Sequence, residues 1–437
     1  MMIDNKTSSF LWHLLLCLLF VPVLQQLFHW HDFDALAGYE KQSSSDPSWT
    51  WAAWNATVYQ KDKEQFRLEN FGYRTALIRL NNQLDYSLFK YSNVDNVVIG
   101  KNDYLFGSDY IKAYTGQNFV CVATVEAKIQ RFKRIQDTLD QMGKHLVMVV
   151  TPNKADFFEN YLPSSAYEKG RKASTNYKAY LKAMQEFSIH HIDFNRFFSA
   201  AKDTLAYPAF PQTGIHLSPY ATAVFTDTLI RYFEHHLQQD LPDFRIASMQ
   251  WTDSASFDET DAENALNLIL ELTPKRFMRL QPSFKYRQKY QPNVLAIGDS
   301  FYWNFLALRS DKYLFHQHRF LYYNKEAFPG GPVNQLNLAE EIDRAEVILM
   351  VNSAFNLWRF GFDFDLDLYL HFFGDELRSQ PLLFYQIVQE KTIAAQKNLE
   401  WMHYIRSQMK AGETEEQVVY NNVAYLLRKK LDRLHPE

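Results

Sequence analysis

The chain has 437 residues, of which 47% are hydrophobic and 22% charged, a balance that excludes a disordered or fibrous protein and allows two or three domains or one large α/β domain. The formal net charge is −4 and no long basic run occurs, so a dedicated nucleic-acid-binding protein is not expected. Two cysteines, Cys17 and Cys121, give neither a disulfide framework nor a Cys/His metal spacing, and no cofactor or metal is expected.

The first predicted element is an apolar helix over residues 10–28. It carries no formal charge, and its 19 residues at about 1.5 Å each span roughly 28 Å, close to the bilayer core of about 30 Å. We expect an uncleaved transmembrane signal anchor rather than a buried soluble helix. A signal peptide cleaved after Ala35–Leu36–Ala37 is the competing interpretation. The flanking charges favour a cytoplasmic tail (residues 1–9) and a periplasmic or extracellular main domain.

A linker and a hairpin follow. Residues 29–95 predict a juxtamembrane linker, polar and turn-rich at 41–50, and then a helix. Residues 97–110 (VVIGKNDYLFGSDY) hold two short apolar runs around a Gly–Lys–Asn–Asp turn, which predicts a β-hairpin.

From about residue 122 the pattern alternates between helix and strand, which is typical of an α/β fold whose parallel sheet is flanked by helices. We assign residues 96–375 to this domain, with an insertion at about 238–290 that holds one helix near 262–272. Residues 376–437 predict a charged helical extension. The main predicted helices are 125–142, 174–187 and one starting at Ser218–Pro219, and the predicted strands are 146–150, a short strand ending at 194, 294–298 and 347–351.

Ser300 is the first candidate site residue. The segment AIGDSF (296–301) closes a buried strand, and FYWNFLALR reads as the following helix, which puts Ser300 at the carboxyl end of a parallel strand. A serine there suits a nucleophile if a base can reach it, but it also suits a simple helix cap. We expect Asp299, next to Ser300, to organise the turn rather than to act as a catalytic acid.

His216 is the second candidate. It lies in the loop PQTGIHLSPYA, just before the helix that Ser218 caps. A loop histidine at a helix start is well placed to face a cleft, although a satisfied surface histidine is equally compatible with the pattern. Together, His216 and Ser300 would form a pair in which the imidazole takes the hydroxyl proton.

These motifs together resemble a known family. A GDSF block before a helix is similar to the nucleophile block of SGNH-type hydrolases. The order of a GKNDYLF hairpin, a TPNK turn (Thr151 to Lys154), a histidine block and then the serine block resembles the SGNH-hydrolase-like proteins of alginate O-acetylation, the AlgJ/AlgX type. The resemblance runs from roughly Tyr59 to Trp358.

The resemblance also exposes a departure. The family's histidine block has the shape Asp-Thr-His-Trp-Thr, and the acidic position corresponds to Gly214 here. Loss of the residue that orients a catalytic imidazole can cost about 10⁴-fold in turnover. Asp193 is the first candidate for a substitute acid and Glu326 the second. A dyad oriented by a backbone carbonyl, or a catalytically weak binding domain, are the alternatives.

Three further residues complete the predicted site. The backbone N–H of Ser300 is the first choice for an oxyanion donor, with Asn352 after the strand 347–351 as a side-chain donor, although Asn352 and Asn356 also suit turn capping. Lys154 follows a strand at the same sheet edge, where it either contacts substrate or is an exposed loop lysine.

The resemblance implies an extracytoplasmic O-acetyltransferase of a cell-surface or secreted polysaccharide, acting through Ser300 and His216. It also implies a membrane-bound O-acyltransferase partner that supplies acetyl groups. Plain ester hydrolysis is the enzymatic alternative. A glycan-binding or assembly subunit of an acetylation complex is the non-catalytic one.

Overall fold

The structure is a computed structural model that describes residues 5–28, 30, 33–38, 45–272, 276–396, 399–410 and 412–435. Residues 1–4 of the expected tail and residues 29, 31–32 and 39–44 of the expected linker lie outside this range. The chain divides into two compact units, one formed by 1–108, 211–215 and 253–276, and the other by 109–210, 216–252 and 277–437.

The first unit is mainly helical. The apolar run at 10–28 lies within helix α1 (Asn5–Phe28), and none of the helices in the described ranges is long and apolar enough to cross a membrane. The expected hairpin is confirmed, because β1 (Val97–Ile99) pairs antiparallel with β2 (Leu105–Gly107). The remaining elements of this unit are α2 (Trp51–Asn55), α3 (Val58–Glu69), α4 (Arg74–Phe89), η1 (Lys101–Asp103), η3 (Phe257–Glu259) and α12 (Asp261–Leu266).

The second unit is built on a six-stranded sheet with the order β4-β3-β10-β7-β8-β9 among the described residues. The first five strands run parallel and β9 runs antiparallel to β8. The sheet is therefore mixed, whereas the sequence predicted a parallel sheet. The strands are β3 (His145–Thr151), β4 (His191–Asp193), β7 (Asn293–Gly298), β8 (Gln317–Tyr322), β9 (Glu326–Phe328) and β10 (Val347–Ser353).

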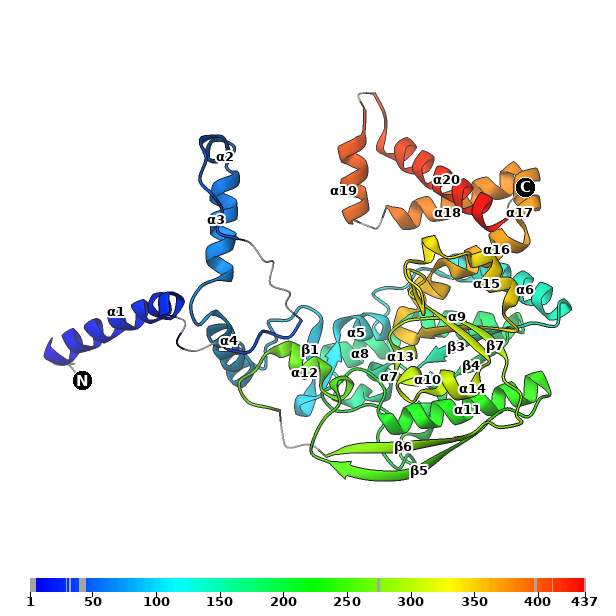
Figure 1. Cartoon of the computed structure of the whole chain (residues 1–437), viewed down its shortest axis with the longest axis horizontal. Helices are drawn as coiled ribbons and strands as arrows, with labels where there is room; N and C mark the ends of the chain where they lie inside the picture. The colour runs from blue at the N-terminus through cyan, green and yellow to red at the C-terminus, as the bar shows by residue number, and fades with distance from the viewer. Residues whose placement is uncertain are drawn as a thin grey trace. The chain divides into compact units, whose positions relative to one another are not determined.

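Helices cover both faces of this sheet (Figure 1). Alternate side chains of a strand point to opposite faces, and Leu146, Met148 and Val150 of β3 join one large apolar core. That core also takes in side chains of α6, α9, α15 and α16, while α10, α11 and α13 lie on the other side. These helices are α6 (Val122–Gln141), α9 (Asn176–Glu186), α10 (Phe194–Ala201), α11 (Pro219–Leu237), α13 (Phe301–Ala307), α15 (Leu338–Arg344) and α16 (Phe364–Phe372).

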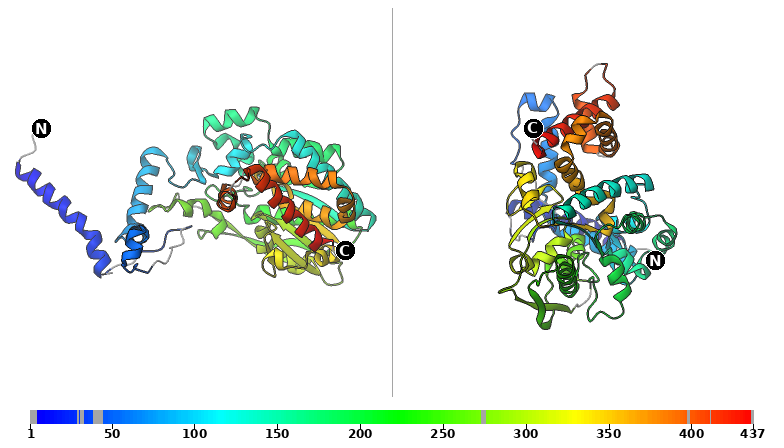
Figure 2. Two further views of the ribbon diagram at one scale, coloured as in Figure 1. Left: turned by 90° about the horizontal axis from the view of Figure 1, so that it is seen from above. Right: turned by 90° about the vertical axis from the view of Figure 1, so that its right-hand side faces the viewer.

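The C-terminal extension is helical, as predicted, and its apolar side chains belong to the same core. Figure 2 draws these helices in orange and red, and α20 contacts both α15 and α16. The extension contains α17 (Gly374–Ser379), α18 (Pro381–Ala395), α19 (Leu399–Gln408) and α20 (Glu415–Leu434).

The region expected as an insertion contains more than one helix. The helix there is shorter than predicted (α12), and two long strands, β5 (Asp243–Thr252) and β6 (Phe277–Lys285), form a separate antiparallel ribbon. The remaining elements of the second unit are short: α5 (Ser108–Tyr114), α7 (Lys154–Phe157), η2 (Glu159–Tyr161), α8 (Ser164–Lys172), α14 (Ser310–Leu314), η4 (Val333–Gln335) and η5 (Ala354–Asp363).

Candidate active site

The candidate site begins where two neighbouring parallel strands end together. Gly298 of β7 pairs with Val351 of β10, so the residues that follow the two strands meet at the carboxyl edge of the sheet. Ligands of open α/β sheets usually bind at this edge. The segment after β7 carries Asp299 and Ser300, while Ser353 is the last residue of β10 and Asn356 lies in η5, which follows it.

Asp299 ties the two strand ends together. Its side chain is fully buried, and Oδ2 accepts hydrogen bonds from the Ser353 amide (2.9 Å), the Ser353 hydroxyl and Asn356 Nδ2 (3.1 Å). Its Oδ1 accepts from the Phe301 amide at 3.2 Å. Asp299 therefore organises the turn, as its position beside Ser300 suggested. The sequence analysis missed Ser353, although its place directly after the core of a buried strand was a usable signal.

Ser300 precedes α13, but its hydroxyl does not cap that helix. Instead, His216 Nε2 lies 2.9 Å from Ser300 Oγ, although 84 residues separate the two in the chain. Both side chains are half-buried, so they are supported by the fold yet reach solvent. The distance lies within hydrogen-bond reach of a base and the hydroxyl it would deprotonate.

Local structure holds the imidazole in place. Ser218 caps α11, since its Oγ accepts from the Ala221 amide at 3.2 Å and donates to the Pro208 carbonyl at 2.7 Å. The chain is thus fixed two residues after His216. The imidazole also lies against the ring of Phe301, with 5.5 Å between ring centroids.

A cluster of aromatic rings adjoins the pair through Phe301. Phe301 lies 6.3 Å from Phe210 and 6.2 Å from Phe355, and Phe355 stacks on Tyr110 at 4.0 Å, all between ring centroids. Such rings give a rigid, largely apolar wall in which electrostatic interactions are stronger than in water.

Gly214, which the resemblance matches to the family's acid, has no room for a side chain. A Cβ atom there would lie 2.4 Å from the carbonyl oxygen of Asp258 and 2.7 Å from the carbonyl carbon and oxygen of Glu259. All three are backbone atoms that cannot turn away. The backbone of 258–259 therefore explains why glycine occupies this position.

The two predicted substitute acids are engaged elsewhere. Asp193 caps α10, with Oδ1 accepting from the Arg196 amide at 3.0 Å and Oδ2 accepting from the Tyr177 hydroxyl at 2.8 Å. Glu326 is exposed on the edge strand β9, and β8 separates that strand from β7. Neither residue is brought to the Ser300–His216 pair.

Asn352 and Lys154 are both fully buried. Asn352 Oδ1 accepts from the Gly361 amide at 3.0 Å and so fixes the turn of η5, which matches the turn-capping alternative. Lys154 is the first residue of α7 rather than an exposed loop residue. Within the described ranges, no three histidine, cysteine or carboxylate side chains lie close enough to hold a metal ion.

These features define the class of protein: an α/β protein with a serine and a histidine in hydrogen-bond contact at the carboxyl edge of a mixed sheet. Residues 97–272 match the family model of the SGNH hydrolase-like domain of the acetyltransferase AlgX. This match confirms the resemblance to the SGNH-hydrolase-like alginate O-acetyltransferases and the SGNH-like α/β fold. The matched segment includes His216 and ends before Ser300.

Three solved structures are similar to part of the chain. The O-acetyltransferase domain of Pseudomonas putida AlgJ is 18% identical with a TM-score of 0.41, over 63% of this chain and 99% of that domain. AlgX of Pseudomonas aeruginosa is 12% identical with a TM-score of 0.42, over 64% and 71%. Bacillus cereus PatB1 is 10% identical with a TM-score of 0.40, over 61% and 99%. A comparison with curated protein sequences gives no match.

Proposed function

We propose that this chain is an O-acetyltransferase that moves an acetyl group to a hydroxyl of a polysaccharide, with Ser300 as the nucleophile and His216 as the base. The 2.9 Å contact between His216 Nε2 and Ser300 Oγ is the observation that carries the proposal. The match of residues 97–272 to an acetyltransferase domain supports the choice of acetyl as the group transferred.

In the first half-reaction, Ser300 Oγ attacks the carbonyl carbon of an acetyl donor while His216 Nε2 takes the hydroxyl proton. The tetrahedral intermediate then collapses, its bond to the donor oxygen breaks, and His216 returns the proton to that leaving group. Ser300 is left as an acetyl ester. The backbone N–H of Ser300 is the proposed donor to the developing oxyanion.

In the second half-reaction, a sugar hydroxyl attacks the acetyl-Ser300 ester. His216 takes the hydroxyl proton and passes it to Ser300 Oγ as the ester bond to serine breaks. The products are the acetylated sugar and free Ser300. Water in place of the sugar hydroxyl would turn the same steps into ester hydrolysis.

A glycan-binding or assembly subunit is the second candidate, and the crowding at Gly214 favours it. Glycine supplies no carboxylate at this position, and loss of an acid that orients a catalytic imidazole lowers turnover steeply. The two candidates differ in one measurable property, which is whether Ser300 becomes acetylated.

The test is acyl-enzyme formation by the full chain. The purified protein is mixed with an activated acetyl ester, and the peptide that contains Ser300 is analysed by mass spectrometry. We expect one added acetyl group on Ser300, its loss in Ser300→Ala, and a fall of at least about 100-fold in the rate for His216→Ala. Ser407→Ala, an exposed serine on α19, is the control and should react like the parent. Equal slow reaction of the parent and Ser300→Ala would leave only the binding function.

The location of the protein is a separate proposal. We propose that α1 holds the chain at a membrane as a signal anchor, and that the catalytic domain lies on the periplasmic or extracellular side beside a membrane-bound O-acyltransferase that supplies acetyl. Phe10, Leu19 and Phe20 of this helix are each more than 60% exposed, which supports a lipid environment. Alkaline extraction of membranes tests this: a chain released with peripheral proteins contradicts it.

A further inference from the structure

Helix α4 presents a stripe of leucines to the outside of the first unit. The side chains of Leu77, Leu80, Leu84 and Leu88, here called the leucine stripe, are 44%, 46%, 50% and 68% exposed. At 3.6 residues per turn these positions fall within about 80° of the helix circumference, and they extend over roughly 16 Å. A continuous apolar surface of this kind marks a site of interaction with a partner protein or a membrane.

The opposite side of α4 is the side that packs on the protein. Tyr86, the buried residue of this helix, lies away from the leucine stripe and belongs to a small apolar core that includes Val97 and Leu266. Asn82 is on the same side as Tyr86, and its Nδ2 donates to the Leu266 carbonyl at 2.8 Å. The first unit therefore fixes the orientation of α4 and leaves the leucine stripe on the outside.

The start of α4 packs on α1, within the segment that we propose to lie in a membrane. Gly72 is so close to the chain at Pro22 that a Cβ atom on this glycine would lie 1.8 Å from the Pro22 carbonyl oxygen. The Tyr73 amide donates to Gln25 Oε1 at 3.2 Å. Pro22 and Gln25 precede Phe28, the last residue of α1, by roughly 9 and 4.5 Å along the helix axis. With α1 inserted as far as Phe28, α4 begins at the boundary between the lipid headgroups and the acyl chains.

Two further hydrogen bonds hold the same junction. Trp30 Nε1 donates to the Tyr73 hydroxyl at 2.6 Å, and Arg79 Nη2 donates to the Ala35 carbonyl at 3.0 Å. The chain that leaves α1 is thus tied to the first turns of α4. Because of these contacts, the depth of α1 in a bilayer also sets the depth of α4. Tryptophan and tyrosine are the side chains that membrane proteins place most often at the water–lipid interface.

We propose that the leucine stripe lies in the extracytoplasmic leaflet of the membrane that α1 enters, with α4 parallel to the membrane surface. A lipid surface is the occupant because the contacts with α1 bring the first turn of α4 to the depth of the acyl chains. The charged residues of α4 are Arg74, Arg79 and Asp85, a net positive balance that suits anionic headgroups beside an apolar face. This inference rests on the proposed location of α1 in a membrane and adds a second membrane contact to it.

The test measures the depth of a nitroxide label at position 84. The full chain, carrying Cys17→Ala, Cys121→Ser and Leu84→Cys, is spin-labelled and reconstituted into vesicles of phosphatidylethanolamine and phosphatidylglycerol with no other protein present. We expect this label to collide with a water-soluble nickel chelate at least about fivefold less often than a label at Leu426→Cys, because acyl chains shield the stripe. Leu426 is the matched control, since it is a leucine of similar exposure, 52%, on α20 of the second unit.

A third label, at Leu19→Cys on α1, separates this proposal from the one on which it rests. If the label at Leu19 is shielded while the label at Leu84 collides with the chelate as often as the label at Leu426, α1 is an anchor but the stripe lies in water, and the proposal is overturned. If the label at Leu19 also collides freely, neither helix enters lipid and both proposals are wrong. Acetylation of Ser300 by an activated ester is measured on the same vesicles, so a failure of the catalytic proposal is seen separately.

Discussion

At position 214 there is room only for the hydrogen atom that is the side chain of glycine. An aspartate side chain introduced there would have to displace the backbone of Asp258 and Glu259, which lies as close as 2.4 Å to the added Cβ. We therefore predict that Gly214→Asp does not place a working triad acid at this position. It should lower the free energy of unfolding by about 1–3 kcal/mol or more, as overpacking does, and leave Ser300 acetylation no faster.

Urea denaturation of Gly214→Asp and the rate of acetyl-Ser300 formation check this prediction. Gly331→Asp is the control, because no atom lies within 4 Å of the position its Cβ would take. A Gly214→Asp protein as stable as the parent and faster in acetylation would contradict the account of this glycine.

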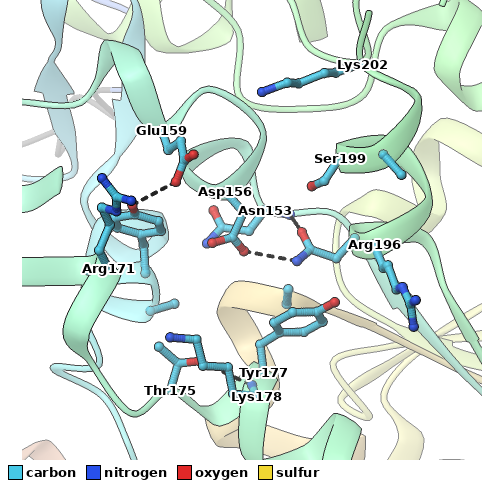
Figure 3. A pocket seen from close by; sticks show the side chains of 16 residues that line it. Asn153, Asp156, Glu159, Arg171, Thr175, Tyr177, Lys178, Arg196, Ser199 and Lys202 are labelled. Atoms are coloured by element: carbon cyan, nitrogen blue, oxygen red, sulfur yellow. Dashed lines mark hydrogen bonds between the residues drawn. The ribbon is translucent and has the colours of Figure 1, made fainter. Parts of the chain in front are cut away.

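Asp156 lines the pocket of Figure 3 and provides a second prediction at this scale. Burial raises the pKa of its carboxyl from 3.8 to about 6. Below pH 4 the group is protonated in both the folded and unfolded states, and as the pH rises through 6 the folded state must hold a buried charge. The contribution of the Asp156 carboxyl to the free energy of unfolding is therefore lost as the pH rises from about 4 to about 6.

The variant Asp156→Asn removes that titration. We predict that it becomes more stable relative to the parent as the pH is raised from 4 to 8, by up to about 3 kcal/mol, since one pKa unit corresponds to about 1.4 kcal/mol. Urea denaturation at both pH values measures the difference. Asp203→Asn, at an exposed position, should show the same difference from the parent at both pH values. A difference for Asp156→Asn that does not change with pH would refute the assigned burial.

At the scale of elements, the sequence predicts secondary structure best where the local hydrophobic pattern agrees with burial in the fold. The apolar runs of β3, β7 and β10 are buried along nearly their whole length, so their hydrophobicity signals a parallel strand. The ribbon of β5 and β6 was missed because most of its side chains are only partly buried or exposed, and Pro282 lies within β6 opposite Ile246, beside a register shift. Proline normally argues against a strand except at such irregular positions.

The cap of α11 is the element that links local structure to the site. We predict that Ser218→Ala lowers the free energy of unfolding by about 1–2 kcal/mol, because the helix loses a cap and the Pro208 carbonyl loses its donor. Acetylation of Ser300 should also slow, since His216 lies two residues before the cap. Urea denaturation and the acetylation assay measure the two effects.

Thr414→Ala is the control for this cap. Thr414 caps α20 at an exposed position, with its hydroxyl accepting from the Gln417 amide at 3.4 Å. That variant should leave acetylation unchanged. Equal effects of Ser218→Ala and Thr414→Ala on acetylation would mean that the cap does not position His216.

At the scale of the whole molecule, separate stretches of sequence form one site. The local settings of Ser300 and His216 suggested that they form a pair, and the two side chains lie in hydrogen-bond contact. The order did not reveal what else reaches the edge of the sheet. Asp193 follows a strand like a site residue but serves as a helix cap, and Lys154 is buried. Such details depend on side-chain packing between elements distant in the chain, which periodicity along the sequence does not encode.

The C-terminal extension gives a prediction at this same scale. Val419, Val423, Leu427, Leu431 and Leu434 of α20 recur every three or four residues and are all buried in the core that also contains β3 and β10. This helix is therefore part of the sheet-containing unit and not a detached tail. We predict that Leu427→Ala lowers the free energy of unfolding by about 2–4 kcal/mol, through lost burial and the cavity left behind.

Leu426→Ala is the matched control, because it makes the same chemical change one residue earlier on the same helix, where the side chain is 52% exposed. It should change stability by about 0.5 kcal/mol or less. Urea denaturation followed by tryptophan fluorescence measures both variants. If Leu427→Ala and Leu426→Ala both change stability only slightly, α20 does not pack on the core. A large effect of Leu427→Ala alone means that truncations before Thr414 remove a piece of the fold, so loss of acetylation in such truncations says nothing about the active site itself.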